Sequence, residues 1–417
     1  MKKKLISLLC ALSLAALTPL CALADDASEP APLSADPADA PGTLSFEHLE
    51  QRVREGNLTM RSVDESMASL DAMDRKQAYD TLLEAHNSMT DMLFNYAKMG
   101  NIYAGSGEAG SFGALYTQMD AGYSAAYLSA QQEQMRAQLD ALKPEEYEKT
   151  YSEAVWQMET SRNQIVYGAQ TLYITTLSLE RSLSDGQRGL AALDRTVAEM
   201  EKRFELGQIS QLTLLELKKT RTETASSLTS LSLQIERLKS QLCALVGESL
   251  TQTCTLLPLP AVTQEQLDAM DIEADLALAK ENSLALYLRQ KEVDDAKEKW
   301  EDASSGYQKD MAEHDYNAIV YSKDAAIQSF ELSFLNLSRT VTDNAQLLEA
   351  AKESLAFEQQ NHEAALLKHE RGMISDNELA TADEALEAAR SKVSACSDSL
   401  LSAYNNYQWA MRGIINE

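Results

Sequence analysis

The chain carries one eight-residue pattern twice, as RFELGQIS at residues 203–210 and as KHERGMIS at residues 368–375. Each copy holds a glycine, Gly207 or Gly372, followed by any residue and then by isoleucine and serine. Glycine adopts the left-handed conformation that ends a helix at the least cost, and serine is a favoured N-cap for the next helix. The pattern therefore predicts two helical turns, and their duplication indicates a molecule built by repetition.

Long helical patterns surround both turns. Before the first turn, apolar residues at positions 190, 193, 197, 200 and 204 alternate steps of three and four, and the same spacing runs from Leu228 to Leu245. After the second turn it runs from Leu379 to Ala410. This spacing is the seam of a left-handed coiled coil, and only 8 prolines and 16 glycines interrupt the 417 residues. We predict an all-α fold of long antiparallel coiled-coil helices in two tandem repeats.

Both repeats are expected to follow one plan: a short helix, a long ascending helix, a distal loop, a long helix down to the glycine turn, and a return helix that ends near Gly247 or Gly413. The opening of the first repeat, residues 55–58, is echoed at residues 281–284. In the first repeat we expect helices at 45–55, at 59–99 with Thr59 as its cap, and from 114 to the turn with a break at Lys143-Pro144, and a loop at 100–113. In the second repeat we expect a break at 303–315.

The first residues predict export. Three lysines, an apolar run over residues 5–20 and an Ala22-Leu23-Ala24 cleavage site form a secretory signal peptide. No later segment has the ~18 uninterrupted apolar residues of a membrane helix. The predicted divisions are a signal peptide at 1–24, a disordered proline-rich leader at 25–42, a first repeat at 43–250, a connector at 251–270 and a second repeat at 271–417.

The mature chain is strongly acidic. Cleavage removes three lysines and no acidic residue, which leaves 34 basic against 64 acidic residues and a net charge of −30. This balance argues against nucleic acid or anionic lipid as the main partner. Of five cysteines, Cys243, Cys254 and Cys396 remain after cleavage. Cys396 lies at a core position of a helix, and whether Cys243 and Cys254 pair across the connector stays open at this point.

The sequence shows no pattern that is typical of an enzyme. Neither a Gly-x-Ser-x-Gly nucleophile motif nor a phosphate-binding loop is present. His362 and His369 lie seven residues apart, whereas metal-binding pairs on a helix lie three or four apart. We therefore expect no catalytic residues, no cofactor and no metal site.

The two turns resemble those of the TolC family of outer-membrane efflux and secretion channels. Members of that family carry an aromatic residue followed by Gly and Ser in each tip turn, and residues 204–215 and 369–379 match this pattern, with His369 in place of the aromatic residue. The openings at 55–57 and 281–283 are also similar to the family's Glu-Asn-x-x-Leu openings. The resemblance covers about residues 43–417.

The resemblance implies a homotrimer whose helices form a hollow cylinder that narrows at the glycine turns. It also implies that the tips dock against a periplasmic adaptor protein. Glu378 falls near the place of a constriction carboxylate, and Thr213 occupies the matching position of the first repeat. The residues aligned with the docking tips are Leu206, Gly207, Ile209, Ser210, Arg371, Gly372, Ile374 and Ser375.

The function expected from this resemblance is that of a passive channel in a tripartite efflux or type I-like secretion system. Its partners would be the adaptor and an inner-membrane ABC or proton-driven transporter, and its location the cell envelope, at the outer membrane where the organism has one. Residues 100–125 and 303–322 lack the alternating strand pattern that family members insert to form a membrane barrel, so we expect a barrel-less relative. The alternative is an exported coiled-coil scaffold without a transport lumen. We expect Ile209 and Ile374 to be apolar residues on exposed tips.

Overall fold

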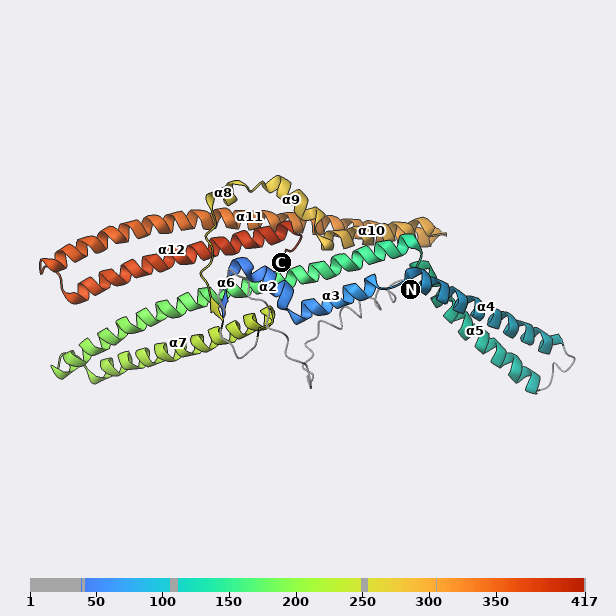
Figure 1. Cartoon of the computed structure of the whole chain (residues 1–417), viewed down its shortest axis with the longest axis horizontal. Coiled ribbons are helices and arrows are strands. Elements are labelled where there is room, and N and C mark those ends of the chain that lie inside the picture. The colour runs from blue at the N-terminus through green and yellow to red at the C-terminus, as the bar shows by residue number, and fades with distance from the viewer. Residues whose placement is uncertain (1–38, 40–41, 106–111, 249–253, 305, 416–417) are drawn as a thin grey trace. The chain divides into compact units, whose positions relative to one another are not determined.

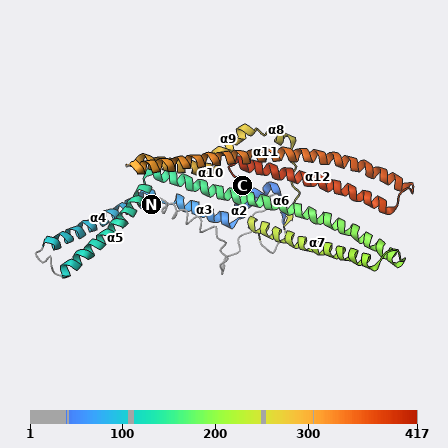
Figure 2. The same ribbon diagram turned by 180° about the vertical axis from the view of Figure 1, so that it is seen from behind.

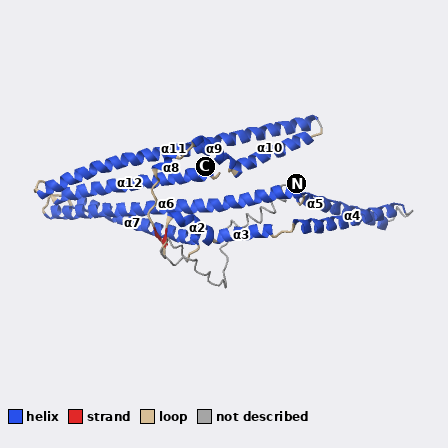
Figure 3. Cartoon of the chain, turned by 45° about the horizontal axis from the view of Figure 1, so that its top comes forward, coloured by secondary structure: helices blue, strands red, loops and turns tan. Residues whose placement is uncertain are grey.

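The computed structural model describes residues 39, 42–105, 112–248, 254–304 and 306–415, and the chain divides into two units. One unit contains residues 59–159, and the other contains residues 31–58 and 160–417. Helices make up nearly all of the described residues (Figure 3), which confirms the predicted all-α fold. The predicted signal peptide lies outside the described residues, as does the predicted leader except for Asp39 and Gly42.

The larger unit is built from two long helical hairpins. The first joins α6 (Pro144–Glu205) to α7 (Gln211–Val246), and the second joins α11 (Gly306–Glu370) to α12 (Asp376–Met411). The two helices of each hairpin run side by side in both Figure 1 and Figure 2. The remaining elements of this unit are β1 (Thr43–Leu44), α2 (Phe46–Gly56), β2 (Thr255–Leu256), α8 (Gln264–Asp268), α9 (Ile272–Glu281) and α10 (Leu284–Asp302).

The helix lengths show the internal repeat directly. The helices that lead to the glycine turns have 62 and 65 residues, and the two return helices have 36 residues each. The second repeat passes from α10 to α11 through residues 303–305 alone. The predicted break at 303–315 is therefore wrong in its extent, because helix α11 already begins at Gly306, where a terminal glycine interrupts no hydrogen-bond ladder.

The core of the second repeat lies between α9, α11 and α12. The rings of Phe334 and Tyr407 are fully buried, with centroids 5.1 Å apart. The Tyr407 hydroxyl donates a hydrogen bond to Asp275 of α9 at 2.5 Å. The predicted seam of α12 is confirmed, since six of its ten positions are buried: Leu386, Ala389, Leu400, Ala403, Tyr407 and Ala410. Cys396, at another seam position, is half-buried against this core.

Helix α6 contacts α12 through a polar seam and through an aromatic contact between Tyr167 and Trp409. Arg181 forms an ion pair with the largely buried Asp398, and Arg188 and Arg195 pair with Glu387 and Glu384. Nearer the other end of the seam, the indole nitrogen of Trp409 donates to Gln170, and Tyr167 bonds to Asn406. These side-chain contacts join the first repeat to the second along most of the length of α12.

A two-stranded parallel sheet links the starts of the two repeats. Thr43 pairs with Thr255 and Leu44 with Leu256. The buried hydroxyl of Tyr173, on α6, lies 2.7 Å from the carbonyl oxygens of both Leu44 and Leu257. Burial raises the pKa of this hydroxyl far above its ordinary value, so it stays a neutral donor. This sheet was not predicted from the sequence, because strands of two residues carry no periodic pattern.

The smaller unit contains α3 (Leu58–Asp71), α4 (Arg75–Gly105), α5 (Phe112–Ala141) and the first turns of α6. Helices α4 and α5 form an antiparallel hairpin (Figure 1), joined by hydrogen bonds from Gln132 to Thr90 and from Arg75 to the Leu142 carbonyl, both 2.8 Å. This hairpin interrupts the first repeat between α3 and α6 and has no counterpart between α10 and α11.

Two predictions for this unit are wrong and one is confirmed. The helix expected at 59–99 begins at Leu58 and stops at Asp71, because Asp74 caps a new helix by accepting a hydrogen bond from the Gln77 amide at 3.0 Å. The loop expected at 100–113 is narrower, since α4 continues to Gly105 and α5 begins at Phe112. The predicted break at Lys143-Pro144 is present.

Candidate functional site: the two glycine turns

The two turns have the same backbone geometry. Gly207 and Gly372 have φ values of +70° and +68°. The Gly207 amide donates to the Phe204 carbonyl and the Gln208 amide to the Arg203 carbonyl, both at 2.8 Å. The second turn repeats this pair of bonds, with Gly372 and Met373 as donors and His369 and Lys368 as acceptors. Both turns are thus Schellman motifs, which satisfy the last free carbonyls of α6 and α11.

Serine begins each return helix, as predicted. The Ser210 hydroxyl accepts a hydrogen bond from the Thr213 amide at 3.2 Å, and the Ser375 hydroxyl accepts one from the Glu378 amide at 3.3 Å. The second turn has a full capping box, because the Glu378 carboxylate in turn accepts a hydrogen bond from the Ser375 amide at 2.7 Å. The Ser375 backbone and hydroxyl bonds hold the pKa of Glu378 below its ordinary value. Thr213 occupies the matching place and bonds to Ser210 through its hydroxyl, at 2.9 Å.

The apolar residues exposed at the turns differ from those expected. Ile209 and Ile374, two residues after the left-handed glycines, are half-buried. Leu206 and Met373 are the exposed ones, at 73% and 68%, and Leu212 follows at 66%. Leu206 was among the predicted tip residues, whereas Met373 was missed. The sequence feature that could have identified Met373 as a tip residue is its place directly after the turn glycine.

Basic side chains precede both turns. Lys202 and Arg203 lie in the last turn of α6, and Lys368 lies in the last turn of α11, just before the exposed Arg371. Cations at a helix C-terminus interact favourably with the helix dipole. In the second turn His369 lies 2.7 Å from Asp376, a contact across the turn that accounts for histidine at the position of Phe204. Each turn thus presents an apolar side chain with basic neighbours.

The opposite ends of the return helices are fixed by a second duplicated arrangement. Gly247 and Gly413 have φ values of +79° and +81°, and an added Cβ would lie 2.1 Å from a backbone oxygen in each case. Those oxygens belong to Gly56 and Asn282, at the repeat openings. The side-chain amides of Asn57 and Asn282 donate to the carbonyls of Leu245 and Met411, at 3.0 and 2.9 Å. The repeat openings noticed in the sequence are therefore anchors for the return helices.

One set of metal-type donors converges among the residues that the structure describes: Cys243, Glu248 and Cys254. Cys243 and Cys254 form a disulfide, with Cα atoms 6.6 Å apart, so the pairing left open by the sequence is present. The Glu248 carboxylate is paired with Arg52 of α2. Since the sulfurs and the carboxylate already have partners, this cluster ties the end of α7 to β2 and α2, and its role is structural.

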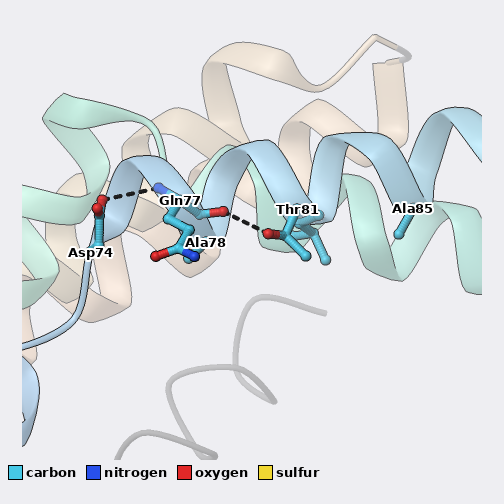
Figure 4. Close-up of a pocket in the computed structure, with 6 residues that line it drawn as sticks. Asp74, Gln77, Ala78, Thr81 and Ala85 are labelled. Carbon is cyan, nitrogen blue, oxygen red and sulfur yellow. Dashed lines mark hydrogen bonds between the residues drawn. The ribbon is translucent and has the colours of Figure 1, made fainter.

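A shallow hollow of about 410 Å³ lies beside α4 and is lined by that helix alone (Figure 4). Its polar groups are used within the helix: Asp74 accepts from the Gln77 amide, and the Thr81 hydroxyl donates to the Gln77 carbonyl at 2.8 Å. Ala78, Leu82 and Ala85 complete the lining. The hollow therefore shows no group of side chains arranged for chemistry.

No helix within the described ranges is both long enough and apolar enough to cross a membrane. No protein-family model matches the chain. No curated protein matches it either. Solved structures do match. The chain is similar to outer membrane channels.

Three of these structures show the extent of the likeness. The open-state MtrE outer membrane channel of Neisseria gonorrhoeae is 11% identical, with 88% of this chain and 89% of that chain covered and a TM-score of 0.43. The outer membrane protein VceC of Vibrio cholerae is 15% identical, with 67% and 76% covered and a TM-score of 0.44. CusC, a protein studied for transmembrane channel formation, is 13% identical, with 94% and 100% covered and a TM-score of 0.47.

Proposed function

We propose that the chain is a passive, trimeric channel component of a tripartite efflux or type I-like secretion system, and that it docks an adaptor protein through its two glycine turns. The observation that carries the proposal is the duplicated tip. At the ends of two long helices, equivalent Schellman turns present Leu206 and Met373 with exposed fractions of 73% and 68%. The repetition of an exposed apolar side chain at two equivalent turns, rather than either residue alone, supports a partner at the tips.

The tip chemistry suits a helical-hairpin adaptor. Leu206 or Met373 would enter a groove between two helices, while Arg203 or Arg371 would pair with carboxylates at its rim. The predicted docking set stays as proposed, with Leu206 more exposed than the half-buried Ile209 and Ile374. Glu378 is proposed to bring a carboxylate to the constricted end, from a side chain that the Ser375 amide holds in place.

Assembly into a trimer is proposed because apolar side chains remain exposed along the helices as well as at the tips. On α11 these are Leu332, Leu347 and Phe357, and on α7 they are Leu215 and Leu233. Each is more than half exposed. Burial against neighbouring copies would remove them from water. The lumen, the location in the cell envelope and the transporter that supplies energy all belong to this proposal.

The test is adaptor binding by tip variants of the mature chain. We expect Leu206→Asp and Met373→Asp each to weaken binding to a helical-hairpin adaptor by about tenfold, because each places an unpaired charge in an apolar groove. The double variant should also stop export. Surface plasmon resonance gives the affinity, and circular dichroism shows that the helix content is unchanged.

Met311→Asp is the matched control, because Met311 is 61% exposed on α11 far from the turn in sequence. Its affinity for the adaptor should equal that of the wild type. If the tip variants bind and export like wild type, the turns are only helix connections. The alternative, an exported coiled-coil scaffold without a lumen, would then explain the chain better.

A further inference from the structure

The disulfide between Cys243 and Cys254 lies in a cluster whose chemistry changes on reduction. In the oxidised chain the two sulfurs are bonded to each other, and the cluster is structural. Reduction adds two electrons and two protons to the disulfide and leaves two thiols. Thiols that lose their protons are strong metal ligands. The reduced cluster is therefore a different chemical site from the oxidised one.

Three donor atoms converge in this cluster. The sulfurs of Cys243 and Cys254 and a carboxylate oxygen of Glu248 all lie within 4.8 Å of one another. Ligands bound to one tetrahedral zinc ion at ~2.0–2.3 Å lie about 3.3–3.8 Å apart, so small side-chain movements would bring all three onto one ion. Cys243 lies in the last turn of α7, and Cys254 directly precedes β2. A helix and a sheet thus hold the backbone that carries the two sulfurs.

Arg52 holds the Glu248 carboxylate beside the sulfurs. The guanidinium pairs with Oε1 of this carboxylate, and the other oxygen, Oε2, lies 3.0 Å from the sulfur of Cys254. A disulfide sulfur carries no proton, so Oε2 gains no hydrogen bond from this contact. Its position suits an oxygen that shares a cation with the neighbouring sulfur. The Glu248 side chain is 18% exposed, which leaves a path for an ion and for water as a fourth ligand.

The charges around the cluster favour a cation. Arg52 lies 3.4 Å from the buried carboxylate of Asp39 and also pairs with Glu248, so one guanidinium faces two carboxylates. Even with His48, 3.5 Å from Asp39, in its protonated form, these four groups would only balance. Two thiolates would then add two uncompensated negative charges to a largely buried site. Buried charges without partners are costly, whereas a divalent cation would neutralise both thiolates.

The second repeat anchors its return helix without such a cluster. Counted from its own terminal glycine, the second return helix has Trp409 and Ile414 at the places of Cys243 and Glu248. Both are buried, at 2% and 6% exposure. A return helix of this kind thus needs neither a thiol nor a carboxylate at its end. The donors of the first repeat therefore indicate a role that the second repeat does not share.

We propose that reduction converts this cluster into a zinc site, with Cys243, Cys254 and Glu248 as ligands and water as the fourth. Zinc binds both sulfur and oxygen, whereas calcium and magnesium bind oxygen, so two thiolates and one carboxylate suit zinc best among these ions. The two thiols release their protons as the ion binds. The zinc ion keeps the end of α7 joined to β2 when the covalent bond is lost. This inference does not depend on the proposed channel function.

The experiment is metal titration of the full mature chain, reduced with a phosphine and kept under nitrogen. Reduced wild type should bind one zinc ion per chain, and cobalt in its place should give a thiolate-to-cobalt charge-transfer band. Oxidised wild type should show no site of this affinity. Cys254→Ser should weaken zinc binding by at least about a hundredfold, and Glu248→Gln by about tenfold. Competition with a chromophoric chelator gives the affinities.

Cys396→Ser is the matched control, because it removes the third cysteine of the predicted mature chain, on α12, and should bind zinc like the wild type. Glu223→Gln, which changes an exposed carboxylate on α7, should also bind like the wild type. Circular dichroism checks that each variant keeps its helix content. In reduced wild type, zinc should slow alkylation of Cys243 and Cys254 and leave that of Cys396 unchanged.

Failure of reduced wild type to bind zinc would overturn the proposal. Equal affinities of the reduced and oxidised chains would do the same, because they would assign binding to the acidic surface. Binding that Cys396→Ser abolishes and Cys254→Ser does not would also contradict it. If Cys254→Ser loses helix content, alkylation of wild type remains the test: rates for Cys243 and Cys254 that zinc leaves unchanged would rule the site out.

Discussion

Glycines with positive φ end α6, α7, α11 and α12, yet their surroundings differ. A Cβ added at Gly207 or Gly372 meets nothing within 4 Å, whereas at Gly247 or Gly413 it meets a backbone oxygen at 2.1 Å. We expect Gly207→Ala to lower the free energy of unfolding by about 1 kcal/mol, from backbone strain alone. Gly247→Ala should cost roughly 3 kcal/mol or more, because the clash with Gly56 adds to that strain. Urea unfolding followed by circular dichroism measures both, and equal losses would contradict the assignment of Gly247 as an anchor.

Also at the residue scale, Glu378 makes the second turn pH-dependent. Its pKa lies below the ordinary value of 4.5 in the folded chain. Its contribution to the stability of the turn is therefore complete above pH 4.5 and is lost as the pH falls through the lowered pKa. We expect Glu378→Gln to speed hydrogen exchange in the first turn of α12 at pH 7, and this difference from wild type to shrink as the pH falls through the lowered pKa toward about pH 2. Glu353→Gln, an exposed site on α11, is the control and should match wild type at both pH values.

At the scale of elements, the polar seam between α6 and α12 holds the two repeats together. The side chains of Arg181 and Asp398 are only 20% and 11% exposed. Arg181→Met should therefore destabilise the chain by about 3 kcal/mol, because it leaves the Asp398 carboxylate buried without its partner. The control is Lys219→Met, whose pair with Glu223 is 75% and 65% exposed and should contribute under ~0.5 kcal/mol. Thermal and urea unfolding give the comparison, and similar small losses would mean that the seam is not a major contact.

The disulfide between Cys243 and Cys254 acts at the same scale, because it closes the segment between α7 and β2. Its sequence separation of 11 predicts that Cys254→Ser lowers the free energy of unfolding by about 3 kcal/mol, through a freer unfolded chain. A reducing agent should have the same effect on wild type and none on the variant. Unchanged stability after reduction would show that α2 and the sheet hold this region without the covalent bond.

At the scale of the whole molecule, the exposed apolar residues of α7 and α11 predict assembly. The mature chain should sediment as a trimer at micromolar concentration, and Leu347→Asp combined with Phe357→Asp should shift it to monomer, because both side chains are more than half exposed on α11. Sedimentation velocity over a hundredfold concentration range measures the oligomeric state of the wild type and of the double variant. Tyr307→Asp, which changes a residue 69% exposed on the same helix, is the control and should sediment like the wild type. A wild-type monomer throughout that range would contradict the proposed trimeric channel.

The sequence by itself determined the features that depend on neighbouring residues. The two turns, the left-handed glycines at 207 and 372, and the caps at Ser210 and Ser375 follow from local backbone demands. The heptad seam of α12 follows from helical periodicity, which is also local. The duplication of these signals was enough to predict two tandem helical repeats.

Only the tertiary structure decided features that depend on residues distant in sequence. The sheet of β1 and β2 is bonded to Tyr173 of α6, which lies far from both strands in sequence. The exposure of Met373 rather than Ile374 became visible only with the side chains in place. The break between α3 and α4 was missed because residues 72–74 contain neither glycine nor proline. Asp74, whose cap begins α4, is one acidic residue among many in this chain. Its role is visible only once the backbone around it is fixed.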